Sequence, residues 1–382
     1  MDAISFWLVI ASLILFVGYI LLIAYYKRGW EECPTITPDE NFRPAKTVTV
    51  IIPARNEQSN IGACISSLQQ QSYPSSLLEI IIVDDHSTDD TSGVVKSFGL
   101  PNLRLISLAE FVSTDLNSYK KKAIEIGIAQ SSGEWIITTD ADCTSDPNWI
   151  SSMMAFQQDT SAELIAGPVK LHARQRFLEI FQALDFLTLQ GITAAAVYRQ
   201  LHIMCNGANL GYSRRAFQAV NGFENIDAIA SGDDMLLMHK VQEKFPGKLF
   251  YLKSISAVVT SLPARTWKNF WQQRIRWSSK ADKYKDKNIF RILLLVYMFN
   301  LALFLLFVIS IFNFDAIIVA FILLLCKTVI EFPFVNSVAK FFNEKRLMTY
   351  FVLMQPFHLV YVIVAGFLGK FGTYEWKGRK VK

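Results

Sequence analysis

The sequence lacks the cysteine pattern that would mark a disulfide-stapled domain or a structural zinc site. It has five cysteines, an odd number, and none of them forms a Cys-x-x-Cys pair. It also lacks internal repeats and low-complexity tracts. The cysteine usage therefore indicates neither a disulfide framework nor a zinc site, and it agrees with a reducing compartment.

Charge is missing from a long run near the N-terminus. The run Ile4–Tyr26 has no charged residue, in a protein of 382 residues that is 52% hydrophobic. The mean hydropathy of +0.27 is too apolar for an ordinary soluble enzyme. At about 1.5 Å per residue, this run spans a hydrocarbon core of about 30 Å. It lacks the basic start and the cleavage site of a signal peptide, so we predict a retained transmembrane anchor over residues 1–28.

The residues after the anchor set the expected topology. Lys27 and Arg28 follow it directly, which places the downstream chain in the cytoplasm by the positive-inside rule. A polar, proline-containing linker is expected over residues 29–46. Residues 289–382 are expected to hold two or three further spans and a basic tail. The candidates are Leu293–Phe312, Met348–Phe367 and a weaker run, Ala316–Val335, which contains Lys327, Glu331 and Pro333.

Between these ends, residues 47–263 have the pattern of an α/β domain. Four apolar runs without alternation predict strands buried on both faces, and three helical candidates separate them. Such an order implies a parallel sheet with right-handed crossovers, in which ligands bind beyond the carboxyl ends of the strands. The strand runs are Thr47–Pro53, Leu77–Asp84, Glu134–Asp142 and Glu163–Val169, with a further strand expected in Phe250–Pro263. The helical candidates are Asn56–Gln70, Ser87–Phe98 and Tyr119–Gln130.

Two more helices carry possible function. A long helix is expected over Arg174–Ala195, and residues 264–288 predict a basic, tryptophan-rich amphipathic helix in the membrane interface. The second helix contains the segment "QQRIRW", whose arginine suits a diphosphate and whose tryptophan suits a sugar face. The alternative, an interfacial helix with no further role, stays open.

Carboxylates end the predicted strands. Asp140 and Asp142 are one residue apart, so on a strand they would share a face and could hold one divalent cation. The alternative is a solvated acidic turn. Asp84 and Asp85 follow a run of Ile and Val, where unpaired acids would be costly.

Helix caps are the alternative explanation for several of these polar residues. Asn56 could cap the helix after the first strand, with Glu57 in its first turn. Ser87 or Thr88 could cap the next helix.

Two further groups of charges have similar alternatives. Lys120 opens a helix with three lysines, which could be a solvated basic face or could reach toward a nucleotide. Asp233 and Asp234 start another helix, where acids stabilise the dipole and where one of them could act as a general base.

In order, the segments PxRNE, DDxSxD, a lysine-led helix, DxD, an acid pair and QxxRW resemble glycosyltransferase family 2, the inverting enzymes with a GT-A fold. The resemblance covers roughly Val48–Trp277, and the flanking apolar segments resemble those of membrane-bound members. It implies a GT-A domain, Rossmann-like with a mostly parallel sheet, over residues 47–263. The chain departs from the pattern at Asp233, often Glu, and at Tyr119, often Gly, which leaves the lysine assignment open.

The resemblance also implies roles for individual residues. The nucleoside pocket would be lined by Pro53, Arg55, Glu57, Asp84 and Asp85, with Lys120 near it. Asp140 and Asp142 would hold the nucleotide and a Mg²⁺ or Mn²⁺ ion on its diphosphate, and Asp234 would be the catalytic base. The diphosphate and acceptor side would be formed by Gly207, Ala208, Asn209, Asp233, Gln273, Arg276 and Trp277.

We therefore expect a membrane-bound, metal-dependent hexosyltransferase that moves a sugar from a nucleotide sugar, expected to be UDP-linked, to a lipid-linked or membrane-proximal acceptor. A processive polysaccharide synthase of the same family is the alternative, although three or four membrane segments are few for a translocation channel. A non-catalytic membrane scaffold would have no need to keep the acids and Arg276 together. A nucleotidyltransferase would need a glycine-rich loop that "PARNEQSN" lacks.

The expected partners are the donor, a lipid-borne or glycan acceptor and the membrane. Nucleic acid is not expected, because the net charge of +5 is modest and the basic residues cluster beside the C-terminal apolar runs. The expected location is the inner membrane, with the catalytic domain on the cytoplasmic side and a role in polysaccharide or glycolipid biosynthesis of the cell envelope.

Overall fold

The computed structural model describes residues 3–37, 39, 41–112, 118–173, 175–227, 229, 232–279, 286–376 and 379–381. They fold into two compact units, which we call the sheet unit and the helical unit. The sheet unit is Cys33–His172 with Ile203–Pro263, and the helical unit is Met1–Glu32, Ala173–His202 and Ala264–Lys382. Parts of the predicted anchor, linker, amphipathic helix and tail, and Arg174 at the start of a predicted helix, lie outside the described residues.

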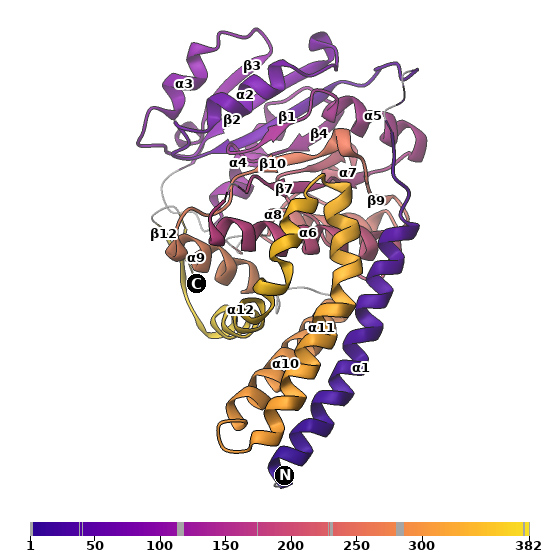
Figure 1. The fold of residues 1–382 in the computed structure, drawn as a ribbon. Helices are drawn as coiled ribbons and strands as arrows, with labels where there is room; N and C mark the ends of the chain where they lie inside the picture. The colour runs from indigo at the N-terminus through magenta and orange to yellow at the C-terminus, as the bar shows by residue number, and fades with distance from the viewer. Residues whose placement is uncertain are drawn as a thin grey trace. The chain divides into compact units, whose positions relative to one another are not determined.

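In the described part of the chain, a seven-stranded sheet in the order β3-β2-β1-β4-β8-β6-β9 forms the centre of the sheet unit (Figure 1). Strands β3, β2, β1 and β4 are parallel, β8 is antiparallel to both of its neighbours, and β6 and β9 are parallel to each other. The sheet is mostly parallel, which confirms the predicted α/β class. Its strands are β1 Val48–Ala54, β2 Leu78–Asp84, β3 Leu103–Ser107, β4 Trp135–Thr138, β6 Leu164–Ala166, β8 Leu210–Ser213 and β9 Leu249–Tyr251.

The central strands form from the β-branched runs, and their side chains are buried on both faces. Helix α4 (Tyr119–Ala129) packs against β1 and β2. A Cβ atom added at Gly127 of this helix would lie 2.8 Å from Cγ2 of Ile51, so glycine permits the close approach. The tight packing fixes where the first residues of α4 lie relative to the strand ends.

Two predicted strands are each divided in the structure. The run Glu163–Val169 becomes β6 and β7 (Val169–Leu171), which belong to different sheets because the chain turns at Gly167 and Pro168. A Cβ atom at Gly167 would lie 2.3 Å from Nδ2 of Asn209, so no side chain fits there. The run Phe250–Pro263 likewise contributes to β9 and β10 (Val259–Ser261), and β10 pairs with β5 (Thr144–Ser145) and β7 in a three-stranded sheet.

Two helices of the sheet unit begin later than the sequence predicts, whereas α4 begins at Tyr119 as predicted. Helix α2 (Ile61–Gln69) has Asn60 at its N-cap, and α3 (Thr91–Ser97) has Asp90. The alternative in which Asn56, Ser87 or Thr88 caps a helix is therefore wrong. The residues before each helix instead form loops that bond to each other, as described below. The other helices of this unit are α5 Trp149–Thr160, α7 Arg214–Ala219 and α8 Asp233–Lys244.

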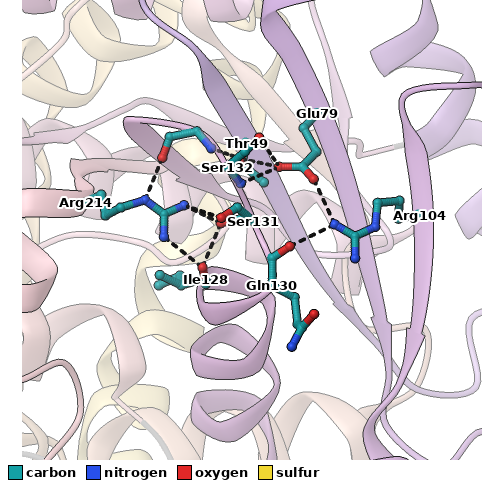
Figure 2. Close-up of polar contacts among 9 residues, drawn as sticks. Thr49, Glu79, Arg104, Ile128, Gln130, Ser131, Ser132 and Arg214 are labelled. Atoms are coloured by element: carbon teal, nitrogen blue, oxygen red, sulfur yellow. Dashed lines mark hydrogen bonds and ion pairs between the residues drawn. The ribbon is translucent and has the colours of Figure 1, made fainter.

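A network of polar contacts lies at the amino-terminal edge of the large sheet (Figure 2). The Glu79 carboxylate accepts hydrogen bonds from Thr49 Oγ1 at 2.9 Å, from the Ser132 backbone at 2.9 Å and from Arg104 Nη1 at 3.1 Å. Burial raises the pKa of Glu79, but the donors of Ser132, Thr49 and Arg104 together lower it by more, so its pKa lies below the ordinary value.

Arg214 is the second centre of this network, which we call the amino-edge network (Figure 2). It follows β8, whose antiparallel direction delivers it to the amino-terminal edge of the parallel strands. Its guanidinium donates at 2.6–3.0 Å to the backbone oxygens of Ile128, Ser131 and Gly133 and to the Ser131 hydroxyl. Glu79 and Arg214 thus each have several partners within the fold.

In the described part of the chain, five helices are long and apolar enough to cross a membrane. All lie in the helical unit: α1 Ala3–Glu32, α6 Phe177–Tyr198, α10 Lys287–Ile309, α11 Phe314–Phe341 and α12 Phe351–Phe371, the last extended back to Lys345 by a 3-10 turn. Helix α1 packs along α6, α10 and α11 (Figure 1). The unit also contains α9 Trp267–Ser278 and the hairpin β11 Tyr374–Trp376 and β12 Arg379–Val381.

Two of these helices differ from the expectation. Helix α11 is continuous through Lys327, Glu331 and Pro333. Lys327 Nζ lies 2.8 Å from Glu331 Oε1 one turn away, so the two charges balance each other. Helix α6 was expected inside the domain over residues 47–263, but it packs with the helical unit. The domain boundaries themselves stay a prediction.

Candidate active site

Three parallel strands bring polar residues to one edge of the large sheet. Strands β2, β1 and β4 are neighbours, so the residues that follow them meet at the carboxyl edge. The backbone N–H of Asp85 donates to the oxygen of Ala54 at 2.7 Å, which joins the ends of β1 and β2. The Thr139 N–H donates to Ile51 at 3.3 Å, which joins β4 to β1.

Asp85 is almost fully buried at this edge and is paired. The Arg55 Nη1 atom donates to its backbone oxygen at 2.9 Å and lies 3.8 Å from its Oδ1 atom. The Nδ1 atom of His86 lies 3.0 Å from the same Oδ1 atom. The sequence indicated that acids at this position need partners. Arg55 and His86 are those partners for Asp85.

The loops after β1 and β2 are joined by hydrogen bonds. Asn56 has a left-handed backbone with φ of 53°, and its side-chain oxygen accepts from the Thr88 N–H at 2.8 Å. The Glu57 side chain accepts from Asn60 Nδ2 at 2.7 Å. Asp84 accepts at 3.3 Å from the Ser87 N–H and, through its other oxygen, from the Ser92 hydroxyl. These bonds shape a rigid loop pair beside partly exposed carboxylates and Pro53.

Asp140 and Asp142 lie in a turn rather than on a strand. Strand β4 ends at Thr138, and the Cys143 N–H closes the turn by donating to the Asp140 oxygen at 3.1 Å. The expectation that the two acids share a strand face is wrong, because the strand ends before them. The Asp142 carboxylate accepts from the Ser261 hydroxyl of β10 at 3.4 Å.

Lys120 joins the acids of two segments. Its Nζ atom lies 2.7 Å from Oδ1 of Asp140 and 3.2 Å from Oδ2 of Asp233. Burial lowers the pKa of Lys120, but the carboxylates of Asp140, Asp233 and Asp234 raise it by more, so the lysine stays charged well above neutral pH. Lys121 points elsewhere and donates to the backbone oxygens of Ile226 and Ile229. The structure thus brings the first lysine of the series to these carboxylates.

Asp234 lies in the first turn of α8, after Gly232 with φ of 81°. Its Oδ2 atom accepts from the Gly207 N–H at 3.0 Å, and its Oδ1 atom accepts from the Met235 N–H at 2.7 Å. A Cβ atom at Gly207 would lie 3.2 Å from Oδ2 of Asp233, so this loop touches both acids. We call Lys120, Asp140, Asp233, Asp234 and Gly207 the acid cluster.

The next two residues of the loop face inward. Ala208 and Asn209 are buried. The Asn209 side chain accepts from Trp149 Nε1 at 2.9 Å and donates to the backbone oxygens of Pro168 and Ala257 at 2.9 and 2.8 Å. The Asn209 amide therefore joins segments of the fold. Within this loop it is Gly207 that contacts the acid cluster.

We tested whether this edge fits a divalent cation. Among the described residues, no group of three or more His, Cys, Asp or Glu side chains is arranged to hold a metal ion. Asp140 and Asp142 supply carboxylate oxygens, and Mg²⁺ commonly takes one or two carboxylates together with phosphate oxygens. The donor set therefore fits a cation carried largely by a diphosphate.

The cysteines beside the acids are not suited to this role. Burial, with the nearby carboxylates of Asp142, Asp140 and Glu57, raises the pKa of the Cys64 thiol to about 12. Burial, with the carboxylates of Asp142 and Asp140, also raises the pKa of Cys143. Both thiols stay protonated at neutral pH, and a protonated, soft sulfur is a poor ligand for a hard cation.

The QxxRW segment lies on α9, in the helical unit. Gln273, Arg276 and Trp277 are partly exposed, whereas Arg274 between them is almost fully buried. The Arg274 guanidinium carbon lies 4.3 Å from the centre of the Trp277 ring. Sequence reasoning did not select Arg274, although its spacing from Phe270 and Trp277 places all three on one helix face.

Comparisons with known proteins agree with this geometry. The chain matches the families described as "Glycosyl transferase family 2" over residues 49–220 and "Glycosyl transferase family group 2" over residues 135–368. It is 25% identical over 249 residues to the probable glycosyltransferase YdaM of Bacillus subtilis, covering 64% of this chain and 57% of that protein. It is 29% identical over 150 residues to the 4,4'-diaponeurosporenoate glycosyltransferase of Staphylococcus aureus, covering 38% of each.

The chain thus spans little more than half of YdaM and less of the staphylococcal enzyme. Among solved structures it is similar to the mannosyltransferase PcManGT of Pyrobaculum calidifontis, determined with GDP-Man and Mn²⁺. That similarity has a TM-score of 0.57 at 20% identity and covers 94% of this chain and 99% of that one. It supports the predicted GT-A fold.

Proposed function

The chain belongs to glycosyltransferase family 2, and on that premise we propose that it moves a sugar from a nucleotide-sugar donor to an acceptor hydroxyl by single displacement. The observation that carries the proposal is the acid cluster, in which Lys120 and the Gly207 N–H orient Asp140, Asp233 and Asp234 beside the carboxyl ends of parallel strands. Ligands of such sheets bind at this edge.

We assign the donor to the loops after β1, β2 and β4. Arg55, Glu57, Asp84 and Asp85, with Pro53 beside them, would face the nucleoside. Asp140 and Asp142 would lie toward the diphosphate and hold Mg²⁺ or Mn²⁺, which would offset the charge of the leaving group. PcManGT was solved with GDP-Man and Mn²⁺, which supports a nucleotide sugar with a divalent cation. We keep UDP as the first donor nucleotide to test.

Asp234 is our proposed base. Two backbone N–H groups hold its carboxylate in place at the start of α8, one on each oxygen. An ionised carboxylate can take the proton of the acceptor hydroxyl as that oxygen attacks the anomeric carbon. The bond from this carbon to the diphosphate oxygen breaks on the opposite face, so the configuration inverts and no covalent enzyme intermediate forms.

For the remaining motif residues we propose the diphosphate and acceptor roles that the family resemblance implies. We propose that Gln273, Arg276 and Trp277 serve diphosphate and acceptor binding, and that Gly207 and Asp233 lie on the acceptor side. The buried side chains of Ala208 and Asn209 would act by shaping the Gly207 loop.

We propose a membrane-bound enzyme with a lipid-borne acceptor. Among the described residues, five apolar helices of sufficient length support membrane association. The name of the staphylococcal relative gives 4,4'-diaponeurosporenoate as its substrate. Lys27 and Arg28 after α1 favour the cytoplasmic side of the inner membrane for the sheet unit.

A donor screen tests the proposal. The full chain in nanodiscs is incubated with UDP-Glc, UDP-Gal, UDP-GlcNAc or GDP-Man and a lipid extract, and products are identified by mass spectrometry. We expect one donor to give a lipid product with a single added sugar of inverted configuration. A ladder of products would indicate the processive alternative, and the absence of product with every donor would contradict the proposal.

A further inference from the structure

The buried face of α9 contains an ion pair that the motif comparison does not assign. Arg274 is 1% exposed, and its Nη1 atom lies 3.1 Å from Oδ2 of Asp185 on α6. The other oxygen of Asp185 lies 3.9 Å from Nε2 of His358 on α12. All three helices belong to the helical unit. A buried charge is costly unless it is paired, so this arrangement needs a reason beyond filling space.

Aromatic rings surround the Arg274 guanidinium. Its central carbon lies 4.3 Å from the ring centre of Trp277, 5.2 Å from that of Phe270 and 5.7 Å from that of Tyr361. A planar guanidinium attracts the faces of such rings, so the contact with Trp277 limits how the indole can turn. Phe186 of α6 lies on the same indole, with ring centres 6.0 Å apart.

The end of α9 is held independently. A Cβ atom added at Gly369 of α12 would lie 2.3 Å from Cβ of Ser278, the last residue of α9. Only glycine permits this approach, so α12 lies directly against the end of the helix. The start of α9 is capped by Thr266, whose hydroxyl accepts from the Asn269 N–H at 3.2 Å. Between these two points, the ion pair joins the helix to α6.

We propose that Arg274, paired with Asp185, is a positioning residue that sets the rotation of α9 and the orientation of the Trp277 indole for sugar transfer. The inference rests on the proposed function of Trp277 and Arg276. Arg276 and Gln273 lie close to Arg274 in sequence. They remain partly exposed, because Arg274 lies on the buried face of the helix and they do not.

Two sets of variants separate positioning from stability. Asp185→Leu together with Arg274→Met replaces the pair with apolar side chains, a change that commonly preserves folding. Arg274→Lys keeps a positive charge but loses the planar group that stacks on Trp277. Lys268→Ala is the matched control, because it removes an exposed cation from the same helix.

The first measurement is hydrogen exchange of the α9 backbone in the full chain, read by mass spectrometry, with Tm as the measure of folding. We expect exchange at least tenfold faster than wild type in Arg274→Lys and in the double variant, and no change in Lys268→Ala. Wild-type exchange in Arg274→Lys would overturn the inference. This readout needs no turnover, so it stands even if the donor screen fails.

The second measurement is turnover with the donor found in the screen. We expect kcat to fall at least tenfold in Arg274→Lys and in the double variant, while KM for the donor changes less than threefold. Wild-type kcat in either variant would overturn the positioning role. Trp277→Ala in the same assay tests the proposed function separately, since wild-type turnover there would contradict the assigned role of Trp277 itself.

Discussion

The amino-terminal and carboxyl edges of the large sheet both place charged side chains beside buried strands. In the amino-edge network, Glu79 receives several donors and Arg214 donates to three backbone carbonyls and a hydroxyl (Figure 2). In the acid cluster, three carboxylates meet around Lys120 and a glycine backbone. Partners inside the fold stabilise the first edge, whereas the second edge keeps an excess of negative charge that suits a cation and a proton transfer.

The first prediction tests the acid cluster. Asp234→Asn should lower kcat by about 10³-fold, because the amide cannot take a proton from the acceptor. Its oxygen can still accept from the Gly207 N–H, so Tm and donor binding should stay near wild type. Turnover, calorimetric donor titration and a thermal melt check this. Near-normal turnover would refute the base assignment.

The second prediction tests the amino-edge network. Arg214→Ala should destabilise the protein by about 3 kcal/mol, since it removes the hydrogen bonds that the charged guanidinium donates to three backbone carbonyl oxygens at this edge. Activity of the folded protein at low temperature should not change. Arg215→Ala is the control: this neighbour is mostly exposed and pairs with the buried Glu163, which keeps its hydrogen bond from the Ser213 hydroxyl, so its loss should cost about 1 kcal/mol. Equal melting shifts in the two variants would contradict the comparison.

The third prediction uses the lowered pKa of Glu79. Its charged form stabilises the fold, so the contribution is complete above the unfolded pKa of about 4.3 and disappears as the pH falls through the lower folded value. Glu79→Gln should therefore cost about 1.5 kcal/mol at pH 7. Thermal melts from pH 7 down to pH 3 should show the wild type and the variant converging at the acid end. A difference that is independent of pH would argue against this assignment.

The smallest predicted effect concerns Lys120. Lys120→Met removes the cation between Asp140 and Asp233, so Mn²⁺ should bind the nucleotide-free protein about fivefold more tightly, equivalent to about 1 kcal/mol. Electron paramagnetic resonance titration measures the affinity without any assay of activity. Lys122→Met, which removes an exposed pair with Glu125, should leave it unchanged. Weaker binding in Lys120→Met would show that the lysine does not compete with the cation.

Sequence patterns predicted the strands that are β-branched and continuous. Strands β1, β2 and β4 carry the runs of Ile and Val and form within the predicted segments, although β4 ends at Thr138, before the two acids. Strands β3, β5 and β8 were not predicted: β3 contains exposed Arg104, β5 has two residues, and β8 contains a glycine. Short or edge strands form through pairing with neighbours, which a local pattern does not encode.

For the site, residue types were predictable and their partners were not. The acids at the strand ends, Lys120 and the acid pair of α8 were all selected from their positions at predicted strand and helix ends and from the family resemblance. Whether Asp140 meets Lys120, or Asn209 turns inward to Trp149, depends on contacts between segments far apart in sequence. The two neighbouring lysines show the limit, because one contacts the acid cluster and the other a backbone loop.

The sequence by itself determined the α/β class, the apolar segments and the order of polar motifs, because hydrophobic runs and the direction of parallel strands are local properties of the chain. Only the tertiary structure decided which charges are balanced. Antiparallel β8 carries Arg214 to the amino-terminal edge, and the packing of α4 through Gly127 brings Lys120 between two carboxylates. Charge balance depends on distances across the fold, and folding alone sets those distances.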